Sequence, residues 1–125
     1  MTSFSRAERV GRHIRNTMAD ILLREVKDPR LKRVTITSVD VSPDLRSAKV
    51  YFATSGDEGQ IERAMEGFHN ARGYIKKLLG QELGLKYMPE IRFYYDDSLD
   101  YGARMEELFR SIGEADGHRH RPNDD

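Results

Sequence analysis

The stretch VTITSVDVSPDLRSAKVYFA (residues 34–53) decides the fold, because two β-like segments flank a tight turn within it. Its first half is rich in β-branched residues, which favour strands. Its second half alternates between small or apolar residues on one side and Lys49 and Tyr51 on the other. The sequence SPD at residues 42–44 is typical of a turn. The stretch therefore predicts an antiparallel hairpin.

The hairpin should be joined by a third strand from Met88 to Asp96, in which Pro89 takes a tolerated position near the start. Within the hairpin, the hydrophobic alternation changes parity between Ile36 and Val39, which predicts a bulge or a twist. One sheet face should be left uncovered, and it should carry Lys49, Tyr51, Arg92 and Tyr94. These side chains could stack bases, or they could simply pair across a solvated sheet.

Amphipathic helices are predicted before the hairpin and after the third strand. Ser5 and Glu8 have the spacing of a capping box, in which each side chain satisfies a backbone N–H of the first turn. Asp28-Pro29 should end the first helix, because the residue before a proline avoids the helical region. The last helix should be capped by Ser98, and its apolar stripe consists of Met105, Leu108, Phe109 and Ile112.

A long helical stretch between the second and third strands begins after Asp57 and contains the sequence Ala71-Arg72-Gly73. Because a glycine inside a helix costs about 1 kcal/mol, we expect two helices that meet at a kink, the second ending at Gly84. The predicted order is α-β-β-α-α-β plus a C-terminal helix. It indicates an α+β two-layer sandwich, with a three-stranded sheet and helices on one face.

The composition is that of one small, highly charged domain. The 125 residues are 38% hydrophobic and 34% charged, and the absence of cysteine excludes disulfides and Cys-ligated zinc. Because no apolar run is long enough for a membrane span and no export signal is visible, we expect a cytoplasmic monomer. Residues 1–113 should form the domain, and residues 114–125 a disordered tail.

The formal charge is zero, but it is unevenly distributed along the chain. Residues 1–50 hold 11 Lys and Arg against 6 Asp and Glu, whereas residues 91–125 hold 5 against 9. Arginines predominate in the basic half, and their planar fork suits phosphate contacts. A cationic face is therefore one interpretation, and solvated helix and turn charges are the alternative.

Seven short elements occur in an order and spacing that carry a family resemblance: residues 28–30 (DPR), 34–37 (VTIT), 42–45 (SPDL), 48–51 (AKVY), 71–73 (ARG), 89–93 (PEIRF) and 96–98 (DDS). Over about residues 4–112 the sequence is similar to the ribosome-binding factor A family. The element order resembles the type II K-homology (KH) domain, an RNA-binding fold. An ordinary KH domain clamps nucleic acid with a Gly-x-x-Gly loop, and the family has an Ala-x-Gly element in its place.

The resemblance implies a ribosome assembly factor rather than an enzyme, and it implies no cofactor. The expected partners are the free or immature small (30S) ribosomal subunit and its 16S rRNA precursor. The expected role is to promote late 16S rRNA processing and maturation, with importance in cold adaptation. A protein–protein adaptor built on the same fold is the alternative, and the acidic C-terminal third favours it.

Three groups of residues are candidates for RNA contact. At the predicted kink, Gly73 would allow a close backbone approach, and free N–H groups at the second helix start would favour an anion. That group is Ala71, Arg72, Gly73, Lys76 and Lys77. The first helix adds Arg6, Arg9, Arg12 and Arg15, and the third group, expected at one end of the sheet, is Arg30, Lys32, Arg33 and Arg46. For each group the alternative is ordinary solvated surface.

Catalytic interpretations find little support in the sequence. No phosphate-binding loop, dinucleotide fingerprint or nucleophile elbow is present. Asp96, Asp97 and Asp100 could suggest a magnesium site, but acidic residues at a helix start are expected from the helix dipole. His118 and His120 could bind a metal, but they fall in the predicted tail.

Overall fold

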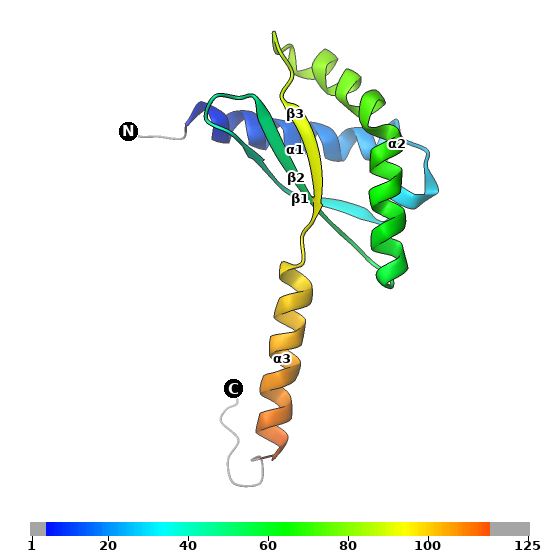
Figure 1. The fold of residues 1–125 in the computed structure, drawn as a ribbon, viewed down its shortest axis with the longest axis vertical. Helices are drawn as coiled ribbons and strands as arrows, with labels where there is room; N and C mark the ends of the chain where they lie inside the picture. The colour runs from blue at the N-terminus through cyan, green and yellow to red at the C-terminus, as the bar shows by residue number, and fades with distance from the viewer. Residues whose placement is uncertain (1–4, 116–125) are drawn as a thin grey trace.

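The structure is a computed structural model that describes residues 5–115 of the chain (Figure 1). Its elements are α1 (Arg6–Arg24), the short 3-10 helix η1 (Pro29–Leu31), β1 (Val34–Val41), β2 (Ser47–Thr54), α2 (Glu58–Leu83), β3 (Glu90–Tyr95) and α3 (Ser98–Ala115). The predicted α+β class with a three-stranded sheet is confirmed. No helix within the described range combines the length and apolarity that a membrane crossing requires.

The strands follow the order β1-β2-β3, so the hairpin strand β2 is central. β1 and β2 are antiparallel, with Val34 opposite Thr54 and Val41 opposite Ala48. The register shifts between Ile36 and Ser38, which confirms the predicted bulge. β3 pairs in parallel with β2, because the long helix α2 carries the chain back to the other end of the sheet.

One face of the sheet is buried beneath α1 and α2. Its side chains join the helix stripes in one core, which contains Ile36, Val41, Val50, Phe52, Ile91 and Phe93 from the strands and Ile14, Met18, Phe68, Ile75 and Leu79 from the helices. The Phe52 and Phe68 rings lie 5.0 Å apart between centroids. The other face is open and carries Lys49, Tyr51, Arg92 and Tyr94, as the alternation of the strands predicted.

The predicted capping box begins α1. Ser5 Oγ accepts from the Glu8 amide at 3.1 Å, and Glu8 Oε1 accepts from the Ser5 amide at 3.1 Å. The predicted end at Asp28-Pro29 is wrong, since α1 stops at Arg24. Asp28 instead caps η1 by accepting from the Arg30 amide at 2.9 Å, because proline is well suited to the first position of a helix.

The prediction of two separate helices is wrong, but the predicted change of direction is present within a single helix. α2 is one hydrogen-bonded helix of 26 residues, and Gly73 lies inside it, although the ribbon bends near its middle (Figure 1). Burial of Phe68 before the glycine and of Ile75 after it offsets the cost of about 1 kcal/mol that glycine brings to a helix. Gly84, with φ +64°, ends α2 as predicted.

α3 extends away from the sheet and from the other helices (Figure 1). Ser98 is its first helical residue instead of its cap, and the Ser98 amide donates to Asp96 Oδ1 at 3.0 Å. The predicted apolar stripe is left exposed, with Leu108 50%, Phe109 62% and Ile112 50% accessible. The predicted tail begins inside α3, which runs to Ala115, and its remainder, residues 116–125, lies outside the described residues.

Candidate nucleic-acid interface

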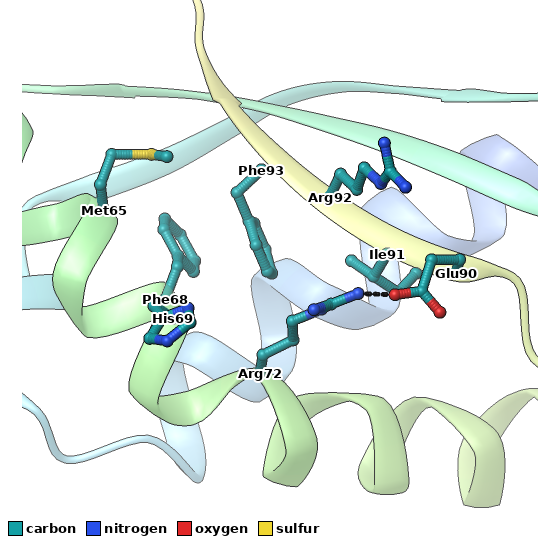
Figure 2. Close-up of a pocket in the computed structure, with 8 residues that line it drawn as sticks. All are labelled: Met65, Phe68, His69, Arg72, Glu90, Ile91, Arg92 and Phe93. Carbon is teal, nitrogen blue, oxygen red and sulfur yellow. Dashed lines mark hydrogen bonds and ion pairs between the residues drawn. The ribbon is translucent and has the colours of Figure 1, made fainter.

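A cleft of about 310 Å³ lies between the first half of α2 and the edge strand β3 (Figure 2). Its apolar floor is formed by Phe68 from α2 and by Ile91 and Phe93 from β3. The Phe68 and Phe93 rings stack with centroids 4.2 Å apart and planes 13° apart. The cleft is therefore an apolar slot beside the Ala71-Arg72-Gly73 element.

Polar side chains surround this slot. Arg72 reaches across from α2 and forms an ion pair with Glu90 at the start of β3 (Figure 2). Lys76 Nζ lies 3.6 Å from the other oxygen of the same carboxylate. His69 lies on the α2 side, whereas Arg92 extends from the opposite side of β3 (Figure 2). Met65 and His69 also line the slot, and the sequence gives no sign of this, because only the packing of α2 against β3 brings them beside β3.

The residues around Gly73 are placed differently from the prediction. The helix is continuous, so Lys76 and Lys77 follow no helix start and no free N–H groups are available there. A Cβ at Gly73 would meet no atom within 4 Å. Gly73 therefore faces open space, and any close backbone approach would have to come from another molecule. Lys77 is exposed, and Ala71 is half-buried against the core.

The four arginines of α1 are all exposed, but they do not face one site. Arg12 and Arg15 line a hollow between α1 and the bulge of β1, together with Ser38. Gly11 makes this close packing possible, since a Cβ there would lie 2.8 Å from the Val39 carbonyl oxygen. Arg6 lies at the start of α1 and lines a different hollow.

The expected cluster of Arg30, Lys32 and Arg33 with Arg46 is wrong. The pairing of Val34 with Thr54 and of Val41 with Ala48 places Arg33 and Arg46 at opposite ends of the hairpin. Arg30 is also held in place, because its guanidinium bonds Asp28 at 2.7 Å and Glu66 at 3.4 Å. The Arg30 hydrogen bond lowers the pKa of the Asp28 carboxyl, and Asp28 in turn raises the pKa of Arg30. Arg30 thus serves the packing of η1.

Arg46 instead lines a hollow together with Arg6 and with residues of the α2–β3 loop. The two arginines line a hollow of about 700 Å³ with Lys86 and Tyr87. Neither Lys86 nor Tyr87 was singled out from the sequence, although an aromatic residue between the helix-ending Gly84 and Pro89 is a usable signal. The predicted cations therefore divide between several sites and do not form one surface.

Asp96, just before α3, and Asp100, in its first turn, have structural roles. Asp96 accepts from the Thr37 hydroxyl at 2.7 Å and from the Ser98 amide, and the Thr37 bond is the main reason that its pKa is lowered. The Tyr95 hydroxyl donates to Asp100 Oδ2 at 2.6 Å, which raises the pKa of Tyr95 to about 12. These contacts fasten the start of α3 to the sheet. Between residues 5 and 115, no three or more His, Asp or Glu side chains are grouped closely enough to hold a metal ion.

Comparison with known proteins agrees with this geometry. The family Ribosome-binding factor A matches residues 6–109. A ribosome-binding factor A from Halothermothrix orenii is 49% identical over 109 residues, which cover 87% of this chain and 89% of the relative. Because the match spans nearly all of α1 to α3, it relates the whole described fold and not one motif.

Two known structures have the same fold, one determined by NMR and the other a homology model fitted into a cryo-EM map. The NMR structure of a Thermotoga maritima protein assigned as a ribosome-binding factor A has a TM-score of 0.67 and 31% identity, covering 78% of this chain and 93% of that one. A Thermus thermophilus ribosome-binding factor A homology model, fitted into a cryo-EM map of a 30S complex, has a TM-score of 0.60 and 20% identity, covering 73% and 96%. The second likeness shows the fold alone. With the match over residues 6–109 and the 49% identity, the chain belongs to the ribosome-binding factor A family.

Proposed function

We propose that this chain binds the free or immature small (30S) ribosomal subunit through its 16S rRNA precursor and promotes late processing and maturation of that RNA. The observation that supports this most strongly is the apolar slot between α2 and β3, which is bordered by Arg72. An apolar slot with a cation at its rim suits an unpaired base and its phosphate. The Thermus relative seen on a 30S subunit supports the same partner for this chain.

The Arg72–Glu90 pair is compatible with phosphate binding. The two side chains are 36% and 48% accessible, and exposed ion pairs contribute little to stability. A phosphate can therefore replace Glu90 as the partner of Arg72 at small cost, and Lys76 would be released by the same exchange. Lys77, which is exposed on the same helix, would add a contact that positions the RNA backbone without reading its sequence.

This binding requires no catalysis and no cofactor. A protein that binds one RNA conformation more tightly than another shifts the RNA folding equilibrium toward it. Such help matters most at low temperature, where misfolded helices are slow to open, so we infer a role in cold adaptation. The protein would act as a cytoplasmic monomer. The family is named for ribosome binding and for no reaction, which supports this view.

Co-sedimentation with purified free 30S subunits tests the proposal. The wild-type protein should pellet with the subunits at low salt and be released as salt rises, because phosphate contacts release counterions. The triple change Arg72→Ala, Lys76→Ala, Lys77→Ala should weaken pelleting at every salt concentration. Lys27→Ala is the charge control, since Lys27 is exposed and does not line the slot. Wild-type protein that never pellets would defeat the proposal.

One observation favours the adaptor alternative, namely the exposed stripe of Leu108, Phe109 and Ile112 on α3. Exposed apolar side chains in a row are typical of a protein-binding helix. Affinity for the subunit that does not change with salt, and that falls on Phe109→Ser, would support an adaptor. A steep salt dependence that is unchanged by Phe109→Ser would support RNA contact.

A further inference from the structure

The hollow at the hairpin end of the sheet is built from three separate chain segments. The start of α1 contributes Arg6, the β1–β2 turn contributes Arg46, and the α2–β3 loop contributes Lys86 and Tyr87. The Glu90 amide donates to the Arg46 carbonyl oxygen at 2.8 Å, which joins the last two segments. At about 700 Å³ the hollow lies within the roughly 300–1,000 Å³ range of small-ligand sites.

The turn that carries Arg46 is held in one conformation. Leu45 has φ +63°, a left-handed conformation that is unusual for leucine. Its amide donates to the Ser42 carbonyl oxygen at 2.8 Å, and the Arg46 amide donates to Asp44 Oδ1 at 3.0 Å. Ser42 Oγ also accepts from the Arg46 amide at 3.2 Å. The backbone of Arg46 is thus fixed before any ligand arrives, which lowers the entropy cost of binding.

The hollow has a net positive charge, because its three cations, Arg6, Arg46 and Lys86, outnumber its two carboxylates, Asp44 and Glu90. Asp44 Oδ1 accepts from the Ser42 hydroxyl at 2.7 Å as well as from the Arg46 amide. Glu90 bonds Arg72 and Lys76 on the far side of β3. In the described part of the chain, Arg6, Arg46 and Lys86 have no carboxylate within ion-pair distance.

Tyr87 gives the hollow an aromatic wall. Its side chain is 78% accessible, the largest exposure of any tyrosine among the described large hydrophobic residues. Lys86 Nζ lies 5.6 Å from the centre of the ring, so a cation already flanks the aromatic face. An exposed ring with cations around it is the arrangement that proteins use for single-stranded nucleic acid, where bases stack and phosphates pair with cations.

We propose that this hollow binds one unpaired nucleotide of RNA, with its base stacked on Tyr87 and its adjoining phosphates held by Arg6, Arg46 and Lys86. The proposal rests on the RNA-binding function proposed above and adds a second contact, on the other side of Glu90 from the slot. An RNA strand that touches both sites would pass over the start of β3.

A single tryptophan can report on the site, because the chain contains none. In Tyr87→Trp, a single-stranded hexamer of adenosine nucleotides should quench the indole emission with a saturable curve. Inorganic polyphosphate, which has no base to stack, should quench it far less. If a hexaglutamate peptide quenches it as well as the RNA does, or if the RNA leaves it unchanged, the nucleotide assignment is overturned.

Affinities of unlabelled variants for a fluorescent form of the same hexamer separate stacking from charge. Tyr87→Leu should weaken binding at least about fivefold, whereas Tyr87→Phe should stay near wild type, because a stacked base depends on the ring. Arg46→Ala should lower the slope of log affinity against log salt by about 0.7, the value for one phosphate of a single strand. Lys27→Ala is the charge control, and circular dichroism melts confirm that each variant folds.

Co-sedimentation with free 30S subunits keeps the two proposals distinguishable. If the wild-type protein pellets and Tyr87→Leu binds the hexamer as tightly as Tyr87→Phe, the proposal that the hollow binds a nucleotide is overturned. The proposed ribosomal function is then unaffected. If the wild-type protein never pellets, the ribosomal function falls, while the difference between Leu and Phe at position 87 still decides whether the hollow binds a base.

Discussion

α2 and α3 are both amphipathic helices, yet one is built into the fold and the other stands apart from it (Figure 1). The stripe of α2 buries Phe68, Ile75 and Leu79 completely. The stripe of α3 leaves Phe109 62% accessible and Leu108 half accessible. Apolar periodicity therefore predicts a helix and its apolar side, but it does not say what covers that side.

The difference lies in how the chain enters each helix. α2 connects the end of β2 to the start of β3, which pairs in parallel with β2, so it must run back along the sheet and cover one face. α3 has no later strand to reach within the described chain. The bonds that the described residues form to hold it lie near its first turn, where Asp96 accepts from Thr37 and Tyr95 donates to Asp100.

Phe68→Ala should have the largest effect on this comparison. Phe68 is fully buried and lies between the rings of Phe52 and Phe93, at 5.0 and 4.2 Å between centroids. Removing the ring should lower the free energy of unfolding by about 3–5 kcal/mol. Urea denaturation followed by circular dichroism measures it. The comparable change Phe109→Ala on α3 is the control, and equal losses in both variants would contradict the distinction between the helices.

Asp96→Ala should have the next largest effect, because it removes the bonds from the Thr37 hydroxyl and the Ser98 amide. We expect a loss of about 1–2 kcal/mol, measured by urea denaturation at pH 7. Asp97→Ala is the neighbouring control. Since the folded pKa of Asp96 is lowered below 3.8, its contribution is present above pH 3.8 and is lost as the pH falls through the folded value. If the stability of Asp96→Ala falls with decreasing pH as much as that of the wild type does, Asp96 does not contribute this tether.

The sequence was a good guide wherever a short local signal has one structural outcome. The Ser5–Glu8 capping box, the bulge after Ile36 and the left-handed Gly84 all lie where the sequence predicts them. It failed where distant segments compete. Gly73 was expected to break a helix, but burial of the α2 stripe on both sides of it outweighs the local preference.

The candidate site was harder to predict than the fold, because charges become a site only through tertiary pairing. Arg30 looked like a binding residue and is instead held by Asp28 and Glu66. Arg6 and Lys86 are 80 positions apart in sequence and line one hollow. No spacing rule links residues so far apart, so only the folded arrangement separates the engaged cations from the available ones.

Gly73→Ala should give a smaller effect of the opposite sign. The added Cβ would meet no atom within 4 Å, and alanine in place of an exposed helical glycine should raise stability by about 0.5–1 kcal/mol. Gly67→Ala is the matched control, since its Cβ would lie 3.1 Å from Leu31 side-chain atoms, and it should not stabilise. Thermal melts measure both. If Gly73→Ala is stabilised but binds 30S subunits more weakly, the glycine serves the close approach of RNA. If Gly73→Ala is destabilised, the glycine is instead required by the structure of α2.

Phe109→Ser should have the smallest effect on the folded body. The ring is mostly exposed on α3, and surface substitutions of this kind usually change the free energy of unfolding by less than about 0.5 kcal/mol. Urea denaturation compared with wild type measures the change. If α3 instead folds back in solution and covers its stripe, the same substitution should cost about 1–3 kcal/mol, the value for burying one large apolar side chain. A loss of that size would remove the distinction between the two helices, because α3 would then be a second covered helix and its stripe would no longer be available to a partner.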